Sequence, residues 1–309
     1  MARKGVFYLA VTGLLFSTYE VVSKIIADGV NPFQINFLRF FFGGLFLLVP
    51  ALRELRKNGN LELNGGNEAN KQSSGILELK DLLSMLFLGI LNIGVSMNLL
   101  QLGINYTRAS IAAVVFSSNP LFVAIAAVLI LRETLSASKI IGLLLGFGGV
   151  VLTFVGDRFG DGSFYQGIFF LVLSAMTFGI YTVLAKRITL RVGSLVMNFF
   201  SFILGSLALL PFLLVLHIPV FSFDFRFWLH IVYLGFFVTG VGYYAYFVGL
   251  SQVDTSLGSM IFFVKPILAS VLAAVVLHEE ITVKLLVGIF LVLLGVYLVQ
   301  RAAFSGEKG

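Results

Sequence analysis

The amino-acid sequence predicts an all-α membrane protein in which ten transmembrane helices form two inverted five-helix repeats around a central cavity. Composition is the first reason: 59% of the 309 residues are hydrophobic and 12% are charged, against about 25% charged in a typical soluble domain. The second is the recurrence of nearly uncharged runs of about 20 residues, the length that crosses a hydrocarbon layer about 30 Å thick. The third is that the second half of the chain repeats the first.

We expect ten apolar segments to span the membrane. They are 5–26, 34–52, 81–103, 108–131, 138–156, 163–186, 193–216, 226–250, 254–277 and 283–301. The first is too long for a signal peptide and contains both Glu20 and Lys24. The last does not alternate as the strand of a membrane β-barrel would. The connection 53–80 is rich in Asn, Gly, Ser, Glu and Lys, so we expect a mobile loop there.

The internal repeat is the strongest signal of the architecture. From the third span onward the shift between copies is 146 residues, the separation of Pro120 and Pro266. The same shift pairs Ser110 with Ser256, Phe116 with Phe262, Glu133 with Glu279, Gly142 with Gly288 and Gly149 with Gly295. The first two spans match the sixth and seventh at a shift of 162, which pairs Gly5 with Gly167, Tyr19 with Tyr181 and Gly43 with Gly205. The long connection accounts for the 16 residues of difference (162 minus 146).

Each copy holds five spans, an odd number, so the second copy must enter the bilayer upside down relative to the first. We assign residues 1–156, with the flexible loop 53–80, to the first repeat and 157–309 to the second. Inverted repeats are typical of secondary transporters, which bind substrate near the bilayer midplane between the halves. Basic residues concentrate in the segments on the N-terminal side, which places both termini in the cytoplasm. We therefore expect a multi-pass protein of the cytoplasmic (inner) membrane.

Two long motifs occupy the fourth and fifth spans and the ninth and tenth. They read YTRASIAAVVFSSNPLFVAIAAVLILRETLSASKIIGLLLGFGGVVL and VDTSLGSMIFFVKPILASVLAAVVLHEEITVKLLVGIFLVLLGV. Both resemble the EamA-type branch of the drug/metabolite transporter superfamily, and Arg39-Phe40 is similar to its Arg-Phe in the second span. The common Trp-Gly of the first span is Phe16-Ser17 here. The resemblance implies ten helices around a central cavity and export or exchange of small metabolites, typically amino acids or related compounds.

Lys265 is the sharpest candidate for a functional residue. It lies near the middle of the ninth span beside Pro266, where a cation costs about 2.5–3.5 kcal/mol on insertion scales. Asn119 takes its place in the first copy, beside Pro120. A proline removes a backbone donor and loosens the preceding turn, which frees carbonyls that can contact a substrate. The structural alternative is a lysine satisfied by those carbonyls or by a partner inside the bundle.

Glu20 lies about one turn from the middle of the first span. Its mate in the second copy is Thr182, so this charge belongs to one half only. Three functional roles are open: binding a substrate ammonium, carrying a proton, and acting as the counter-ion of Lys265. The structural alternative is a pair with Lys24 one helical turn away.

The third span carries Asn98, Gln101 and Asn105 on one helical face. Polar groups in a bilayer need partners inside the bundle, so this face is either a cavity wall or a site of interhelical hydrogen bonds. For Asn98 we favour the cavity wall, because Tyr244 replaces it in the other half.

Tyr19 and Tyr181 form a symmetric pair that either flanks the substrate or packs. Arg39 lies a turn and a half inside the outer edge of the second span, so its guanidinium can snorkel toward the headgroups. We favour this structural role over the alternative, contact with the substrate. Glu133 and Glu279 follow helix ends in both copies, which indicates a shared structural role.

Several classes of chemistry find no support in the sequence. Cysteine is absent, and the three histidines, His217, His230 and His278, are scattered near predicted helix ends. No Walker loop, metal-ligand cluster or nucleophile triad occurs. We therefore predict no catalytic residue, no metal site and no cofactor, and a protein that is not an enzyme.

The predicted function is a secondary transporter that exports or exchanges a small polar metabolite, an amino acid or a relative, by alternating access. The predicted substrate-binding residues are Lys265, Glu20, Asn119, Asn98, Tyr19 and Tyr181. Carriers of sugar phosphates or nucleotide sugars, of lipid-linked sugars or of drugs are the alternatives within transport, and a membrane scaffold subunit is the alternative outside it. The expected partners are a small-molecule substrate and the lipid bilayer, with no nucleic acid. A coupling proton, and the choice between monomer and homodimer, are left open.

Overall fold

The computed structural model describes residues 2–63, 77–131, 137–154, 162–250 and 261–306. Seven helical segments are long and apolar enough to cross a membrane, and three shorter apolar helices complete ten. The first half contains α1 (Ala2–Ser17), α2 (Tyr19–Ile26), α3 (Pro32–Leu63), α4 (Leu79–Gly89), η2 (Ile90–Met97), α5 (Asn98–Tyr106), α6 (Ala109–Ser117), α7 (Asn119–Leu131) and α8 (Ala137–Phe154). The second contains α9 (Gly162–Val192), α10 (Ser194–Val215), η3 (Phe225–Phe227), α11 (Trp228–Tyr233), η4 (Leu234–Val241), α12 (Gly242–Leu250), α14 (Ile261–Leu277) and α15 (Val283–Gly306). The predicted all-α fold with ten spans is confirmed.

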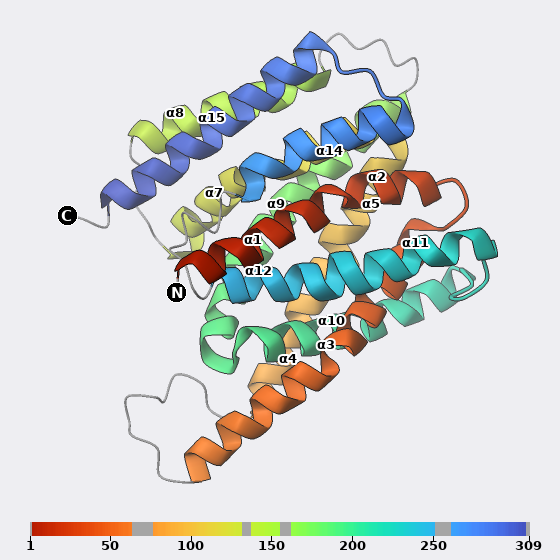
Figure 1. Ribbon diagram of the computed structural model, residues 1–309, viewed down its shortest axis with the longest axis vertical. Coiled ribbons are helices and arrows are strands. Elements are labelled where there is room, and N and C mark those ends of the chain that lie inside the picture. The colour runs from red at the N-terminus through yellow and green to blue at the C-terminus, as the bar shows by residue number, and fades with distance from the viewer. Residues whose placement is uncertain (1, 64–76, 132–136, 155–161, 251–260, 307–309) are drawn as a thin grey trace.

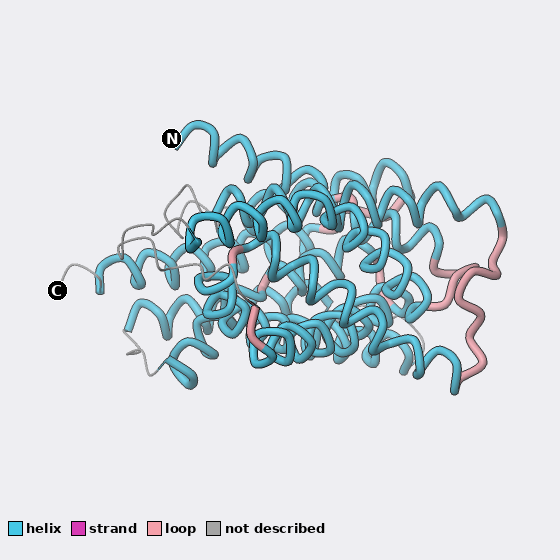
Figure 2. The backbone as a smooth tube through the Cα atoms, turned by 90° about the horizontal axis from the view of Figure 1, so that it is seen from below, coloured by secondary structure: helices cyan, strands magenta, loops and turns pink. Residues whose placement is uncertain are grey.

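The helices run side by side in one bundle, and both chain ends lie at the same end of it (Figures 1 and 2). Helices α8 and α15, the last span of each repeat, pack on each other at one edge of the bundle (Figure 1). Helix α14 lies against α1, α2 and α6, so the ninth span is surrounded by helices of the first repeat. This arrangement brings Lys265 of the second half next to Glu20 of the first.

Glycines mark the places where the two repeats touch most closely. A Cβ atom built on Gly89 would lie 2.3 Å from the carbonyl oxygen of Ser201 and 2.8 Å from the Cα of Gly205, so neither helix has room for a side chain. The symmetry-related crossing is also close, although less tight, since a Cβ on Gly43 would lie 3.1 Å from the carbonyl oxygen of Gly235. Small residues at a crossing let helix backbones approach in a membrane.

The other close glycine contacts follow the same rule. Gly103 meets Gly167 while its mate Gly249 meets Gly5, and Gly149 meets Gly288 while Gly142 meets Gly295. Every contact between the halves in this set thus has a symmetry-related twin, as inverted repeats require. The repeated glycines of the sequence therefore serve the packing of one repeat on the other.

Several spans are interrupted near their middles. The first span breaks at Thr18, whose hydroxyl donates to the carbonyl of Leu15 at 2.7 Å and competes with the helical hydrogen bond. The fourth span breaks at Ser118, directly before Asn119 and Pro120, as the proline predicts. Helix α14 instead continues through Pro266 from Ile261, so the expected break beside Lys265 is wrong for the described part of this span.

The third and eighth spans each contain an eight-residue π-helical segment, η2 and η4. The two segments overlap under the 146-residue shift of the repeat. π-Helical turns are rare and are frequently found at functional sites. The sequence did not indicate them, because no residue pattern in these apolar runs distinguishes a π turn from an α turn.

The predicted mobile loop 53–80 is too long at both ends. Helix α3 continues to Leu63, beyond the end of the bundle, and α4 begins at Leu79 (Figure 1). Glu78 and Asp81 form a capping box at the start of α4, and Arg191 pairs with both carboxylates at 3.0 and 3.1 Å. Residues 64–76 lie outside the described part of the chain.

Candidate functional site

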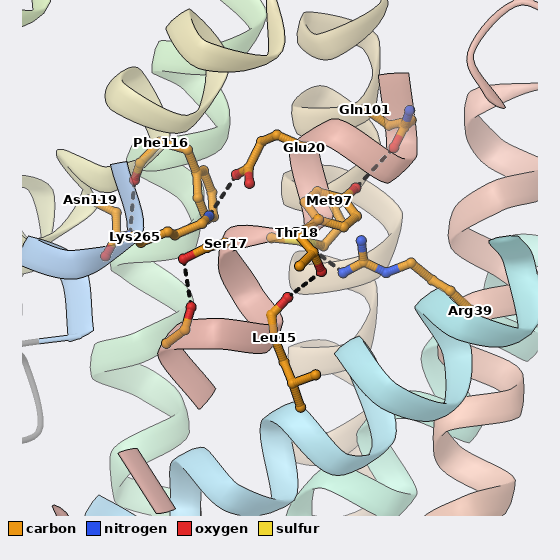
Figure 3. A network of polar contacts seen from close by, with 12 residues as sticks. Leu15, Ser17, Thr18, Glu20, Arg39, Met97, Gln101, Phe116, Asn119 and Lys265 are labelled. Atoms are coloured by element: carbon orange, nitrogen blue, oxygen red, sulfur yellow. Dashed lines mark hydrogen bonds and ion pairs between the residues drawn. The ribbon is translucent and has the colours of Figure 1, made fainter. Parts of the chain in front are cut away.

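The centre of the candidate site is an ion pair between the two repeats. The ammonium of Lys265 on α14 donates to Oε1 of Glu20 on α2 at 2.6 Å (Figure 3). Glu20 is fully buried and Lys265 is 4% exposed. Removing two charges from water costs several kcal/mol for each ion, which their attraction must offset. A pair in this position is by default a candidate functional site.

An aromatic ring and an amide adjoin this pair. The Lys265 ammonium lies 4.6 Å from the centre of the Phe116 ring, within the range of a cation–π contact. Asn119, one turn further along the same span, donates from Nδ2 to the carbonyl of Phe116 at 3.0 Å. Figure 3 shows Asn119 and Phe116 on the same side of Lys265. The two mates of the repeat, Lys265 and Asn119, therefore meet at one place.

Tyr181 reaches the site through a row of rings. Its ring lies 5.5 Å from Phe178, which in turn lies 5.2 Å from Phe116. The Tyr181 hydroxyl is buried and has no hydrogen-bond partner among the described residues. The predicted site residue Tyr181 thus lies two ring contacts away from the Phe116 ring that contacts Lys265.

Tyr19 and Arg39 form a second polar group next to the first. The Tyr19 hydroxyl donates to Oε1 of Gln101 at 2.9 Å, and the Arg39 guanidinium lies over the Tyr19 ring at 4.1 Å. Arg39 is 2% exposed. The prediction that it snorkels to the headgroups is therefore wrong: the side chain lies inside the bundle because the Tyr19 and Phe40 rings and Met97 surround it.

Asn98 holds helices together in the structure. Its Nδ2 donates to the carbonyls of Ile93 and Gly94 in the π segment, at 2.9 and 3.1 Å, and its Oδ1 accepts from Asn36 at 2.8 Å. The side chain thus satisfies carbonyls that the π turn displaces. Of the two interpretations left open by the sequence, these contacts favour interhelical hydrogen bonding over a cavity wall.

Lys24 does not pair with Glu20. Its ammonium donates to the carbonyls of Ile104 and Asn105, both at 2.9 Å. These carbonyls belong to the last turn of α5, where a cation is favoured by the free acceptors and the helix dipole. The structural alternative for Glu20, a pair with Lys24, is therefore wrong.

Glu279 has the structural role that its repetition indicated. It follows α14 and accepts from the backbone N–H of Ala109 at 2.7 Å and of Ser110 at 3.1 Å, and from the Ser110 hydroxyl. It therefore caps the N-terminus of α6 from the other repeat, where a carboxylate complements free donors and the helix dipole. Its mate Glu133 lies outside the described residues.

Three charged residues in the bundle core break the symmetry of the repeats. The mates of Glu20, Lys265 and Arg39 are Thr182, Asn119 and Ser201, all uncharged. The glycine crossings, by contrast, keep the symmetry. Asymmetry therefore distinguishes the polar site from the scaffold, and the same comparison of copies could have identified Arg39 from the sequence. Among the described residues no group of three or more His, Cys, Asp or Glu side chains could hold a metal ion.

The fold and the buried charges define a polytopic membrane protein of the transporter class. The profile of the EamA-like transporter family matches residues 3–155 and again 165–301. The chain belongs to this family, within the drug/metabolite transporter superfamily.

Individual relatives agree with this assignment. An "uncharacterized transporter" of Clostridium kluyveri is 32% identical over 300 residues, which cover 95% of this chain and 92% of the relative. An "uncharacterized transporter" of Archaeoglobus fulgidus is 31% identical over 73% of this chain and 80% of its own length. A solved structure described as "crystal structure of protein" covers 99% of this chain and 100% of its own, with a TM-score of 0.67 at 19% identity, and so supports the fold alone.

Proposed function

We propose that this protein is a secondary transporter that exports or exchanges an amino acid or a related small polar metabolite across the cytoplasmic membrane, with both termini in the cytoplasm. The observation that carries the proposal is the buried Glu20–Lys265 pair, which joins the two repeats at 2.6 Å. Each residue of the pair would exchange its protein partner for the oppositely charged group of the substrate. Alternating access would follow from the rocking of the two halves about this point.

A zwitterion matches the pair in both charge and geometry. Its ammonium replaces Lys265 as the partner of Glu20, and its carboxylate replaces Glu20 as the partner of Lys265. Neither buried protein charge is then left alone, in the loaded carrier or in the unloaded one, which matters because an unpaired buried charge is strongly destabilising. A solute that separates the pair but carries no anionic group would leave Lys265 without an anion.

In this proposal some of the remaining predicted residues contact the substrate and others support the site. Asn119, which shares Phe116 with Lys265, would contact the substrate at the ion pair. Tyr181, two rings away, would contact a more distant part of it. Tyr19 would position Arg39 and the start of α2, because its ring and hydroxyl both have partners. Asn98 would support the π segment behind the site. Glu20 is also the group that could carry a coupling proton, a role that a pH gradient across liposomes would reveal.

The test is counterflow in proteoliposomes. Vesicles loaded with each of the twenty amino acids in turn are given the same labelled amino acid outside, and uptake is measured for the wild type and three variants. Lys265→Asn and Glu20→Thr each install the residue of the other repeat, so the fold already tolerates these residues at the related positions. Lys24→Met is the matched control, because it removes an ammonium of the same span that donates to the carbonyls of Ile104 and Asn105 and does not pair with Glu20.

We expect at least a hundredfold loss of counterflow in Lys265→Asn and Glu20→Thr, and near wild-type rates in Lys24→Met. Folding is checked by monodisperse elution in detergent. Full activity of a folded Lys265→Asn variant would rule out the proposed site. Flux of sugar phosphates, nucleotide sugars or drugs without flux of amino acids would move the protein to one of the alternative carriers, and no flux of any kind would favour the scaffold.

A further inference from the structure

We infer that Arg39 binds an anionic group of the transported molecule, so that the substrate is an amino acid with a second anionic group, a carboxylate or a phosphate. The inference rests on the proposed function. It assigns a role to Arg39, a buried charged residue of the core for which a simple zwitterion has no partner.

Arg39 is buried like a core residue, but it lacks the hydrogen-bond and ion-pair partners that a buried charge normally has among the described residues. Its Nε and Nη1 have no geometric hydrogen-bond partner among the described residues, and Nη2 donates to the Met97 sulfur at 3.6 Å. The guanidinium also interacts with the Tyr19 hydroxyl, which is a neutral group. No ion pair joins it to a carboxylate in the described part of the chain. The guanidinium carbon lies 4.1 Å from the centre of the Tyr19 ring and 4.5 Å from that of Phe40. A guanidinium binds a carboxylate or phosphate through Nη2 together with either Nε or Nη1. Here Nη2 has only the weak acceptor of a thioether sulfur, which an anion would displace.

A buried amide lies in the same region. The polar atoms of the Asn92 side chain are buried, and this side chain interacts with the Tyr243 hydroxyl, which also interacts electrostatically with Arg39. Asn92 belongs to the π segment η2, whose last residue is Met97. Tyr243 therefore connects the surroundings of Arg39 with the π segment of the third span.

The charge balance of the core selects the class of substrate. Glu20 and Lys265 neutralise each other, which leaves the single positive charge of Arg39. A molecule with one ammonium and two anionic groups at charge −1 each carries a net charge of −1 and balances the whole site. A neutral amino acid balances the ion pair but leaves the guanidinium unpaired.

The two groups meet at the start of α2. Tyr19 and Glu20 are consecutive; the Tyr19 ring contacts Arg39, and the Glu20 carboxylate pairs with Lys265. The close view shows Lys265 and Arg39 on opposite sides of the break at Thr18 (Figure 3). A ligand bound at this break would have the ion pair on one side and the guanidinium on the other.

The experiment compares acidic amino acids with their uncharged counterparts in the same proteoliposomes. Counterflow of aspartate and glutamate is measured against asparagine and glutamine, and phosphoserine against serine, for the wild type, Arg39→Gln and Arg39→Lys. Ser201→Ala, at the position of the other repeat that corresponds to Arg39, is the control for disturbing the equivalent packing in the seventh span.

We expect the wild type to prefer the acidic member of a pair at least tenfold. Arg39→Gln should abolish that preference while retaining flux of the uncharged member, and Arg39→Lys should keep part of it. A preference for phosphoserine over aspartate would identify the second anion as a phosphate, and the reverse would identify a carboxylate.

Each outcome decides one of the two proposals. A wild type that prefers uncharged amino acids, or an Arg39→Gln variant that loses both members of a pair equally, overturns the role of Arg39 while the transport of amino acids stands. If Arg39→Gln does not fold, the wild-type preference and the Arg39→Lys variant still decide. No flux of any amino acid refutes the proposed function itself, and the inference with it.

Discussion

Removing one charge of the Glu20–Lys265 pair should destabilise the protein more than removing both. At 2.6 Å the attraction is about 6 kcal/mol for an effective dielectric constant of about 20. Much of that offsets the desolvation of two buried ions, so the net value of the pair is far smaller. Deleting one partner leaves the other buried and unpaired, at a cost of about 3–5 kcal/mol. Replacing both by uncharged residues of similar size is often neutral.

The assay is a double-mutant cycle built from Glu20→Gln, Lys265→Met and the combined variant. Thermal denaturation in detergent should show a clear drop in the melting temperature for each single variant and a recovery toward the wild type in the combined one. Transport should not recover, because the combined variant has no charge to offer a zwitterion. Single variants as stable as the wild type, or losses that simply add in the combined variant, would refute a pair that stabilises the core.

Three further predictions concern the scaffold, and thermal denaturation checks each. Glu279→Ala should cost about 1–2 kcal/mol through loss of the cap on α6, whereas Glu280→Ala, at the exposed neighbouring residue, should be neutral; equal losses would contradict the cap. Gly89→Ala should cost about 1–3 kcal/mol by overpacking, whereas Gly148→Ala, where an added Cβ meets nothing within 4 Å, should not; a tolerated Gly89→Ala would contradict the crossing. Thr18→Val removes hydrogen bonds to Leu15 and the Tyr233 hydroxyl and should cost about 1–2 kcal/mol; an unchanged melting temperature would contradict a role for that hydroxyl.

The fold was accessible from the sequence because its signals are long and repeated. Apolar runs of membrane-crossing length locate the spans without any knowledge of their contacts. The glycine pairs in the two copies predicted the symmetry that the helix crossings confirm. Helix ends were harder to predict, since α3 and α9 continue beyond their apolar stretches into segments that contain charged residues, where hydropathy does not mark the end of the helix.

The site was only partly accessible. Lys265 and Glu20 were found because a charge in an apolar run is conspicuous, and a salt bridge between them was one of three roles left open for Glu20. Arg39 was misplaced, because depth along a span was estimated from the sequence while the rings that enclose the side chain come from other helices. Asn98 was interpreted from its own span, whereas its contacts depend on a π turn that leaves no trace in the residue pattern.

The paired glycine crossings also suggest substitutions that would change the resting orientation of the carrier. If the halves alternate between two access states, the approximate twofold symmetry exchanges the crossing of Gly89 and Gly205 with that of Gly43 and Gly235. If the two helices of one crossing move closer when the carrier opens to one side of the membrane, the helices of the other crossing move closer when it opens to the opposite side. A slightly larger residue at one crossing would therefore bias the carrier toward one face, and the same change at its twin would bias it toward the opposite face. The scaffold thus contains matched positions at which substitutions should shift the resting orientation in opposite directions.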